Sequence, residues 1–452
     1  MPEESVTKSR PAASFRRVLR LQDLVLYGII IIQPTAPMPV FGVVSQQARG
    51  HVVTAVLIAM VAMLFTAISY GRMARVYPSA GSAYAYVTNE IHPSLGYLTG
   101  WSITMDYLLN PIICTIWCSK AAGNFLPFIP YPLLAVAFAL LFTILNLRGI
   151  EASARLNQWL AYSMGAVVVL FFGYAVAYLL HQPALSGADF LRPFYDPKTF
   201  SVSALSSGTA IAVLTYIGFD GVSTLSEEVE NPQRNILLAT VLTCLITGVL
   251  ASLEVYAGQL IWPDFHHYPD VDTAFVYVAA RAGGMFLFTI MNLALLVATL
   301  GSGFGSQLGA ARLLYGMGRD NVIPQKFFGK LDPVRQIPRN NVLFSGALAI
   351  IGALTLSYQL GAELLNFGAF IAFMGVNAAA LTHYYVREKK KKLSNLIPPS
   401  VGFAVCLLLW LNLSRTAQVA GTVWMVAGIL FGAWKTRGFR GELVQFDVPA
   451  DV

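Results

Sequence analysis

"GIIIIQPTAPMPVFG", residues 28–42, lies in the first apolar run of the chain and decides how that run folds. Pro34, Pro37 and Pro39 each lack a backbone N–H and clash with the preceding turn of a helix. A continuous helix through all three prolines is therefore not expected. The run is predicted to break in its middle.

A second interrupted run, "LTYIGFDGVSTLSEE", covers residues 214–228. Gly218 and Gly221 stand on either side of Asp220, and glycine weakens a helix relative to alanine. A carboxylate within an apolar run needs a partner or a water-filled cavity. This run is also predicted to break.

The composition is that of a membrane protein rather than a soluble domain. Of the 452 residues, 56% are apolar and only 12% are charged, whereas an ordinary globular chain carries about 25% charged residues. A helix needs about 20 apolar residues to cross a bilayer. We expect an all-α membrane protein with about twelve spans, at 21–45, 52–72, 83–122, 131–148, 154–181, 204–226, 236–262, 284–316, 341–358, 361–385, 397–413 and 418–435.

The positive charges predict the orientation of these spans. Lysine and arginine gather on alternate links, and the net charge is +7. Because cytoplasmic links carry the excess of positive residues, both termini are predicted to be cytoplasmic, in the inner (plasma) membrane. The charge is thereby assigned to the links between spans, and no nucleic-acid partner is expected. Membrane lipids are the expected surroundings.

The two breaks fall in the first and sixth spans, which are five positions apart. This spacing is expected if residues 21–181 and 204–385 form two inverted repeats of five spans each. Corresponding broken helices in two halves of a chain point to a substrate site at the membrane midplane, because half-helix ends offer free backbone groups.

Four motifs resemble the amino acid, polyamine and organocation transporter superfamily. They are "FTAISYGRMARVYPSAGSAYAYV" at 65–87, "GWSITMDYLLNP" at 100–111, "YIGFDGVSTLSEEVENPQRNI" at 216–236 and "ARLLYGMGRDNVIP" at 311–324. Within the superfamily the likeness is greatest to bacterial putrescine importers. The resemblance implies a LeuT-like core of ten helices in two inverted repeats, with peripheral spans at 397–435 and cytoplasmic tails at 1–20 and 436–452.

The same resemblance implies alternating access and proton-coupled uptake of a small molecule. No cofactor is expected, and sodium stays open as an alternative coupling ion. Some relatives place a lysine in the fifth span where this chain has Met164, so that route of proton coupling is not supported. Putrescine importers carry an acid in the first span where this chain has Pro39, whereas Glu254 stands where they are apolar.

Asp220 is the first candidate for contact with substrate. An organic ammonium would compensate a buried carboxylate on binding; alternatively, Asp220 hydrogen-bonds the unwound sixth helix. Tyr216, Phe219 and Gly221 would form the wall of the site, with the aromatic faces offering cation–π contacts.

Two further acids lie within predicted spans. Asp106, in the third span, is either a proton carrier or the partner of a fixed hydrogen bond, and the neighbouring Tyr107 is a candidate substrate contact. Glu254, in the seventh span, is a second amine contact, a coupling site or a partner for another helix. Glu227 and Glu228, at the cytoplasmic edge of the sixth span, are candidates for gating or inner-loop pairing.

The break in the first span supplies the remaining candidate substrate contacts: Gln33, Thr35 and Met38. The segment "QPTAP" has no glycine with which to build a backbone nest for a carboxylate, and this weighs against ordinary α-amino acids. The four cysteines have no histidine or acid beside them at metal-ligand spacing, so no metal site is predicted.

The leading hypothesis is a proton-coupled importer of an organic amine, and the alternative is a permease or exchanger for amino acids or small neutral solutes. An enzyme is not expected, because the spans contain neither an HExxH motif nor a GxSxG elbow. A nutrient sensor built on a transporter fold is a third reading. The expected oligomeric state is a monomer or a homodimer.

Overall fold

The computed structural model is all-helical, apart from one isolated bridge between Leu19 and Val229 in the part it describes. It describes residues 19–77, 82–148, 154–182, 186–224, 229–319, 323–335 and 337–439. Eight helices in these ranges are long and apolar enough to cross a membrane. The chain is therefore a multi-pass membrane protein, as its composition predicts.

The first predicted break is confirmed. Helix α1 (Leu21–Ile32) ends before the prolines, and α2 (Phe41–Gln47) begins after them. Gln33 takes a positive φ of 72° at the end of α1, so the chain leaves the helical path one residue before Pro34. The prolines thus fix both the existence and the place of this break.

The second predicted break is also confirmed. Helix α9 (Val202–Ala212) continues as a 3-10 turn, η1 (Val213–Tyr216), and α10 (Gly221–Thr224) follows after a non-helical link. Gly218 in this link has a φ of 118°, a conformation that L-residues with a side chain rarely adopt. Glycine is therefore required at this point of the break.

One predicted span is wrong in its extent. Residues 83–122 form two helices, α4 (Ser82–Glu90) and α5 (Pro93–Gly123), rather than one. His92 caps α5, because its ring accepts a hydrogen bond from the backbone N–H of Ser94, and Pro93 occupies the first helical position. A cap followed by proline starts a new helix, and this signal outweighs the apolar character of the run.

The eighth predicted span, 284–316, lies within a longer element. Helix α12 (Ala274–Arg319) includes a further segment before the span, and its helical path is interrupted at Gly283 and Gly284. Gly284 has a φ of 65°. The glycine pair therefore separates the short segment that starts at Ala274 from the long membrane helix.

The other helices begin and end within a few residues of the predicted spans. They are α3 (Val52–Val76), α6 (Tyr131–Leu147), α7 (Ala154–Leu180), α11 (Pro232–Ile261), α14 (Arg339–Thr355), α15 (Tyr358–Leu381), α16 (Leu393–Leu411) and α17 (Arg415–Lys435). Helix α15 continues into a π-helical turn, η2 (Thr382–Arg387). Two short helices, α8 (Gly187–Leu191) and α13 (Gln325–Phe328), lie in the links.

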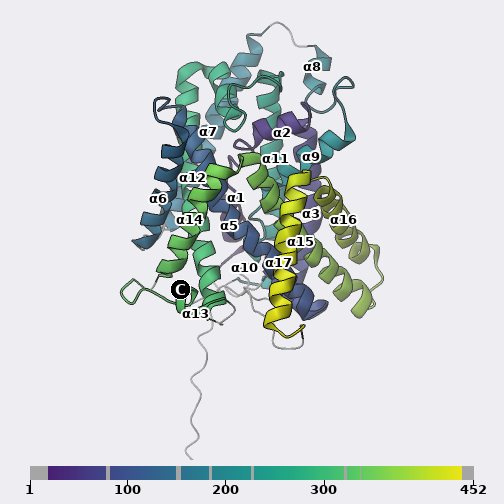
Figure 1. Cartoon of the computed structure of the whole chain (residues 1–452). Helices are drawn as coiled ribbons and strands as arrows, with labels where there is room; N and C mark the ends of the chain where they lie inside the picture. The colour runs from purple at the N-terminus through teal and green to yellow at the C-terminus, as the bar shows by residue number, and fades with distance from the viewer. Residues whose placement is uncertain are drawn as a thin grey trace, which may run out of the picture.

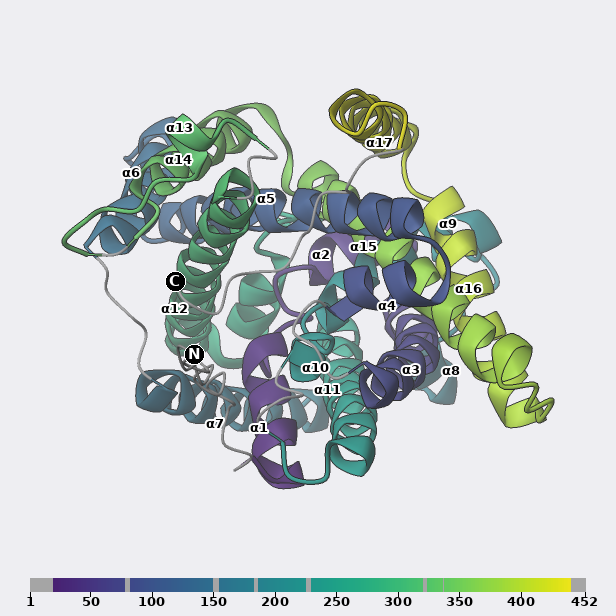
Figure 2. The same ribbon diagram turned by 90° about the horizontal axis from the view of Figure 1, so that it is seen from below.

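The helical segments that follow the two breaks lie in the interior of the bundle. Seen along the bundle, α2 and α10 lie near the centre, with α3, α4, α5, α11, α12 and α15 around them (Figure 2). Helices α16 and α17 lie at the outside, and α17 ends at the lower face (Figure 1). Val423, Leu430 and Trp434 of α17 are exposed, which suits contact with lipid rather than water.

Candidate functional site

The two breaks lie against each other in the interior. A Cβ added at Gly218 would fall 2.6 Å from Cγ2 of Ile31, and one added at Gly221 would fall 3.1 Å from its Cδ1. The amide nitrogen of the Gln33 side chain donates a hydrogen bond of 3.2 Å to the carbonyl of Ala298 in α12. The end of α1 is thus held between the second break and α12.

Two acids meet beside these breaks. Asp106 comes from the middle of α5 and Asp220 from the second break, and the two carboxyl groups lie within electrostatic range of each other. Both residues are half-buried rather than fully enclosed. Two carboxyl groups within a membrane helix bundle need a compensating partner or a water-filled cavity.

The backbone of the second break holds Asp220 in place. Its carboxylate receives hydrogen bonds from the backbone amides of Gly218, Gly221 and Asp220 itself. The backbone carbonyl of Asp220 also accepts a bond of 2.6 Å from the hydroxyl of Ser223. One face of the carboxylate is therefore used to fix the unwound segment.

Tyrosines surround the acid pair. Tyr107 of α5 lies within electrostatic range of Asp106 and Asp220, and its ring packs 3.1 Å from the position of a Cβ added at Gly309. Tyr70 of α3 and Tyr86 of α4 also lie within range of Asp220, and their rings meet edge to face with centroids 6.1 Å apart.

Tyr70 and Tyr86 are the residues that sequence reasoning missed. They stand in the stretch 65–87, which the sequence singles out only as a family motif. The contact between Tyr70 and Phe219, with ring centroids 5.5 Å apart, places α3 against the second break. This contact joins helices that are distant in the sequence, so no periodicity within one helix reveals it.

Tyr216 and Phe219 pack into the protein interior next to the second break. Both are fully buried, and the hydroxyl of Tyr216 donates a hydrogen bond of 2.9 Å to the carbonyl of Val56 in α3. Thr35 and Met38, in the first break, are each 1% exposed. The role of these four residues as substrate contacts stays a prediction.

Glu254 lies apart from the acid pair. It is fully buried in α11, and it is absent from the groups that act electrostatically on Asp106 or Asp220. Within the part of the chain that the structure describes, neither of its carboxyl oxygens has a hydrogen-bond partner. Glu227 and Glu228 lie outside the described residues.

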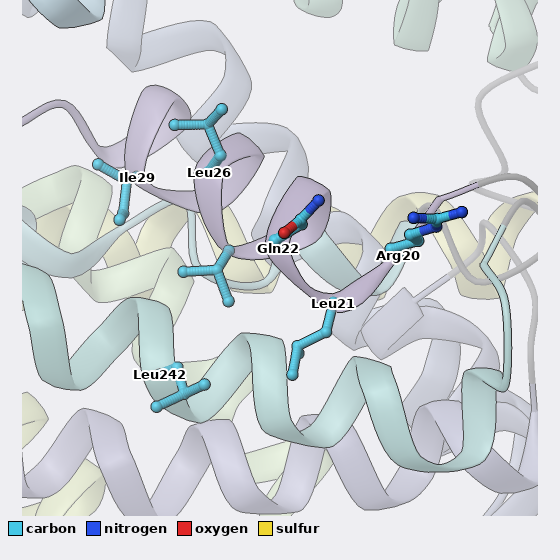
Figure 3. A pocket seen from close by; sticks show the side chains of 7 residues that line it. Arg20, Leu21, Gln22, Leu26, Ile29 and Leu242 are labelled. Atoms are coloured by element: carbon cyan, nitrogen blue, oxygen red, sulfur yellow. The ribbon is translucent and has the colours of Figure 1, made fainter.

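A separate groove runs between α1 and α11 (Figure 3). Its lining is mostly apolar, with Leu21, Leu26, Ile29 and Leu242 along its walls and Arg20 at one end. None of the candidate substrate contacts lines this groove. The acid pair, which has both charge and partial enclosure, is therefore the candidate site.

Comparison with known proteins places this geometry in a family. Residues 40–442 match the amino acid permease family, so the chain belongs to that family of membrane transporters. It is 33% identical to the low-affinity putrescine importer PlaP of Escherichia coli (strain K12), over 98% of this chain and 99% of the relative. The predicted superfamily is thereby confirmed, and the class of protein is a transporter, not an enzyme.

More distant relatives are named for other substrates. The chain is 26% identical to the branched-chain amino acid permease BcaP of Lactococcus lactis, over 92% of this chain and 93% of the relative. It is also 26% identical to a methylthioribose transporter of Bacillus subtilis, over 95% of both chains. Family membership therefore indicates a small-molecule substrate without naming it.

Proposed function

We propose that this permease is a secondary active transporter that imports a small organic amine, polyamine-like or a related cation, by alternating access. The observation that carries the proposal is that Asp106 of α5 and Asp220 of the second break lie within electrostatic range of each other. Two like charges within electrostatic range repel each other, so such a pair favours a cation between its members.

One tyrosine supports the same class of substrate. Tyr107 is partly exposed and lies within electrostatic range of both acids, whereas Tyr70 and Tyr86 are fully buried. An ammonium group over such a ring gains about 0.5–2 kcal/mol, depending on how far it is desolvated. A neutral solute would gain from the apolar ring faces but would leave the two carboxyl groups uncompensated.

The first break is poorly suited to a substrate carboxylate. A nest for an anion is built from successive backbone N–H groups, but Pro34, Pro37 and Pro39 have none to offer. This is a physical reason to prefer amines over α-amino acids as the substrate class. The match to a putrescine importer points the same way.

The fold that accompanies this function has twelve spans. In our proposal, residues 21–181 and 204–385 form two inverted repeats of the LeuT-like kind, with α16 and α17 as peripheral spans. Both termini are cytoplasmic, in the plasma membrane, and protons are the coupling ion, with sodium as the alternative. The protein works as a monomer or a homodimer.

An amino-acid or neutral-solute permease is the second candidate function. It is favoured by the backbone hydrogen bonds to Asp220, which give this carboxylate a structural role that needs no cationic substrate. The relatives named for branched-chain amino acids and for methylthioribose belong to the same family.

Uptake by purified protein in liposomes separates the two functions. Under an inward proton gradient the wild type should accumulate radiolabelled putrescine, and both Asp106→Asn and Asp220→Asn should lose this uptake. Asp189→Asn, in the exposed helix α8, is the matched control and should transport normally. Uptake of leucine but not putrescine, unaffected by either substitution in the acid pair, would overturn the amine proposal.

A further inference from the structure

Glu254 is an unexplained carboxyl group in the interior of the bundle. It is fully buried, and both of its oxygens lack a hydrogen-bond partner among the described residues. Glu363 of α15 shows the usual arrangement for comparison. It is 4% exposed, and it accepts hydrogen bonds of 2.8 Å from Gln359 and 3.2 Å from the backbone N–H of Ser414.

Contacts along α11 show which way Glu254 faces. Gly28 of α1 packs directly on Thr243, and a Cβ added at Gly258 would fall 3.1 Å from the rings of both Phe41 in α2 and Phe275 in α12. Thr243, Glu254 and Gly258 are separated by 11 and 4 residues, which places them on one stripe of a helix with 3.6 residues per turn.

This stripe runs along the broken first helix. Its lower contact is with α1 and its upper contact is with α2, and Glu254 stands between them, about 16 Å above Thr243 and about 6 Å below Gly258 at 1.5 Å per residue. The exposed face of α11 is different and carries Leu245, Ile246, Val249 and Leu253. The helical spacing therefore places Glu254 on the face of α11 that packs against α1 and α2, at a height between these two contacts.

No described charged side chain compensates the carboxyl group of Glu254. Several described ionisable side chains lie on the helical elements packed against α11. They are Asp23 and Tyr27 of α1, Tyr70, Arg72 and Arg75 of α3, Tyr162, Tyr174 and Tyr178 of α7, Tyr216 of η1, and Tyr277, Arg281, Arg312, Tyr315 and Arg319 of α12. None of these described groups acts electrostatically on Glu254. An unpaired charge at this place would cost several kcal/mol, so a carboxyl group that holds a proton fits this position better than a carboxylate.

We propose that Glu254 is the proton-carrying residue of the transporter, set against the break of the first helix, an inference that rests on the proposed function. When α1 and α2 move during alternating access, water reaches the break and the carboxyl group releases its proton to that water. The carboxylate takes a proton from water on the other side before it is buried again. Glu254 thus couples protonation to the arrangement of the broken helix.

The test uses Glu254→Gln, a neutral isostere of the protonated side chain, in liposomes with radiolabelled putrescine. Exchange of putrescine at equal pH should persist. Accumulation driven by a proton gradient should disappear, and a gradient of one pH unit supplies about tenfold accumulation per proton in the wild type. Glu363→Gln is the control and should keep both activities. Gradient-driven accumulation by Glu254→Gln equal to that of the wild type would overturn the proposal.

A second measurement separates this proposal from the proposed function. If the wild type carries no amine, infrared spectroscopy still reports whether Glu254 is protonated. The C=O band of a protonated carboxyl group should be present in the wild type and in Glu363→Gln and should be missing from Glu254→Gln. An identical band in all three proteins contradicts the proposal, as does failure of Glu254→Gln to fold, because glutamine reproduces the neutral shape.

Discussion

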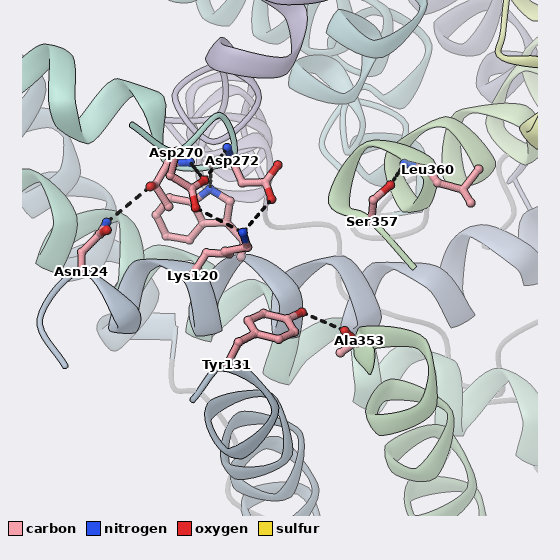
Figure 4. Close-up of polar contacts among 10 residues, drawn as sticks. Lys120, Asn124, Tyr131, Asp270, Asp272, Ala353, Ser357 and Leu360 are labelled. Carbon is pink, nitrogen blue, oxygen red and sulfur yellow. Dashed lines mark hydrogen bonds and ion pairs between the residues drawn. The ribbon is translucent and has the colours of Figure 1, made fainter. Parts of the chain in front are cut away.

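Lys120 Nζ lies 3.2 Å from Oδ2 of Asp270, and this ion pair ties the end of α5 to the loop between α11 and α12 (Figure 4). The same ammonium group lies 3.8 Å from Asp272, whose backbone carbonyl accepts a hydrogen bond of 2.8 Å from Trp117. The loop at residues 262–273 is therefore fastened to the helix that also carries Asp106.

Asp272 gives this loop a dependence on pH. Burial, together with the nearby charge of Asp270, raises the pKa of Asp272 to about 6 in spite of the attraction of Lys120. A raised carboxyl pKa means that stability is greatest below the unfolded pKa of about 4 and is lost as the pH rises through the folded value. Asp272→Asn should remove this loss, on the order of 2 kcal/mol at pH 7.

Thermal unfolding measured at pH 5 and pH 7 checks the role of Asp272. The difference in stability between the two pH values should shrink in Asp272→Asn. Asp189→Asn is the control and should leave this difference unchanged, because hydrogen bonds from Ser186 lower the pKa of Asp189 and it is ionised at both pH values. The same pH dependence in Asp272→Asn as in the wild type would be inconsistent with the assignment.

Glu90 joins α4 to the end of α15. Its side chain is 1% exposed and accepts hydrogen bonds of 2.7 Å from the Tyr77 hydroxyl and 2.6 Å from Nδ1 of His383, and Arg387 lies 3.2 Å away. Breaking a buried pair by removing one partner costs about 3–5 kcal/mol. Glu90→Ala should therefore destabilise the protein strongly.

Tyr77→Phe is the matched variant for this cluster. It removes only one hydrogen bond and should cost about 1 kcal/mol. Thermal unfolding of the two variants in the same detergent measures the contrast. Equal and small losses in both would show that Glu90 does not hold the two elements together.

Gly218→Ala should impair both stability and transport. The substitution forces a side chain into a φ of 118° and brings its Cβ within 2.6 Å of Ile31, and an unfavourable backbone conformation alone costs about 1–3 kcal/mol. Ile31→Ala should rescue the steric part of the loss but not the backbone part. Gly173→Ala, at an open position of α7, is the control.

A double-mutant cycle on unfolding and uptake resolves the two parts. The coupling between Gly218→Ala and Ile31→Ala should exceed about 0.5 kcal/mol, as for residues in contact. Full rescue would mean that only the contact matters. No rescue would mean that the two breaks do not depend on this close approach.

The fold could be predicted wherever single residues impose a local conformation. Pro34, Pro37 and Pro39 forbid a helix, and Gly218 and Gly221 weaken one, so both breaks were predictable from the sequence. The boundary between α4 and α5 was missed because His92 and Pro93 sit within a run that is apolar enough to pass as one span. The average hydropathy of residues 83–122 predicted one span, although a two-residue capping signal marks the start of a second helix.

The candidate site could be predicted only in part. Asp106, Asp220 and Glu254 stand out because carboxyl groups are rare in membrane helices. Tyr70 and Tyr86 did not stand out, because tyrosine is common and their contact with the second break arises from packing between helices. The direction in which Tyr216 points was likewise set by a partner, Val56, that is 160 residues away.

The most direct test of the amine proposal is equilibrium binding of radiolabelled putrescine to the purified protein and to Asp106→Asn, Asp220→Asn and the double variant. If the two acids share one cation, each single substitution should weaken binding at least about tenfold, or about 1.4 kcal/mol. The double variant should then lose less than the sum of the two. Unchanged affinity in both single variants, or displacement of putrescine by leucine alone, would contradict the account.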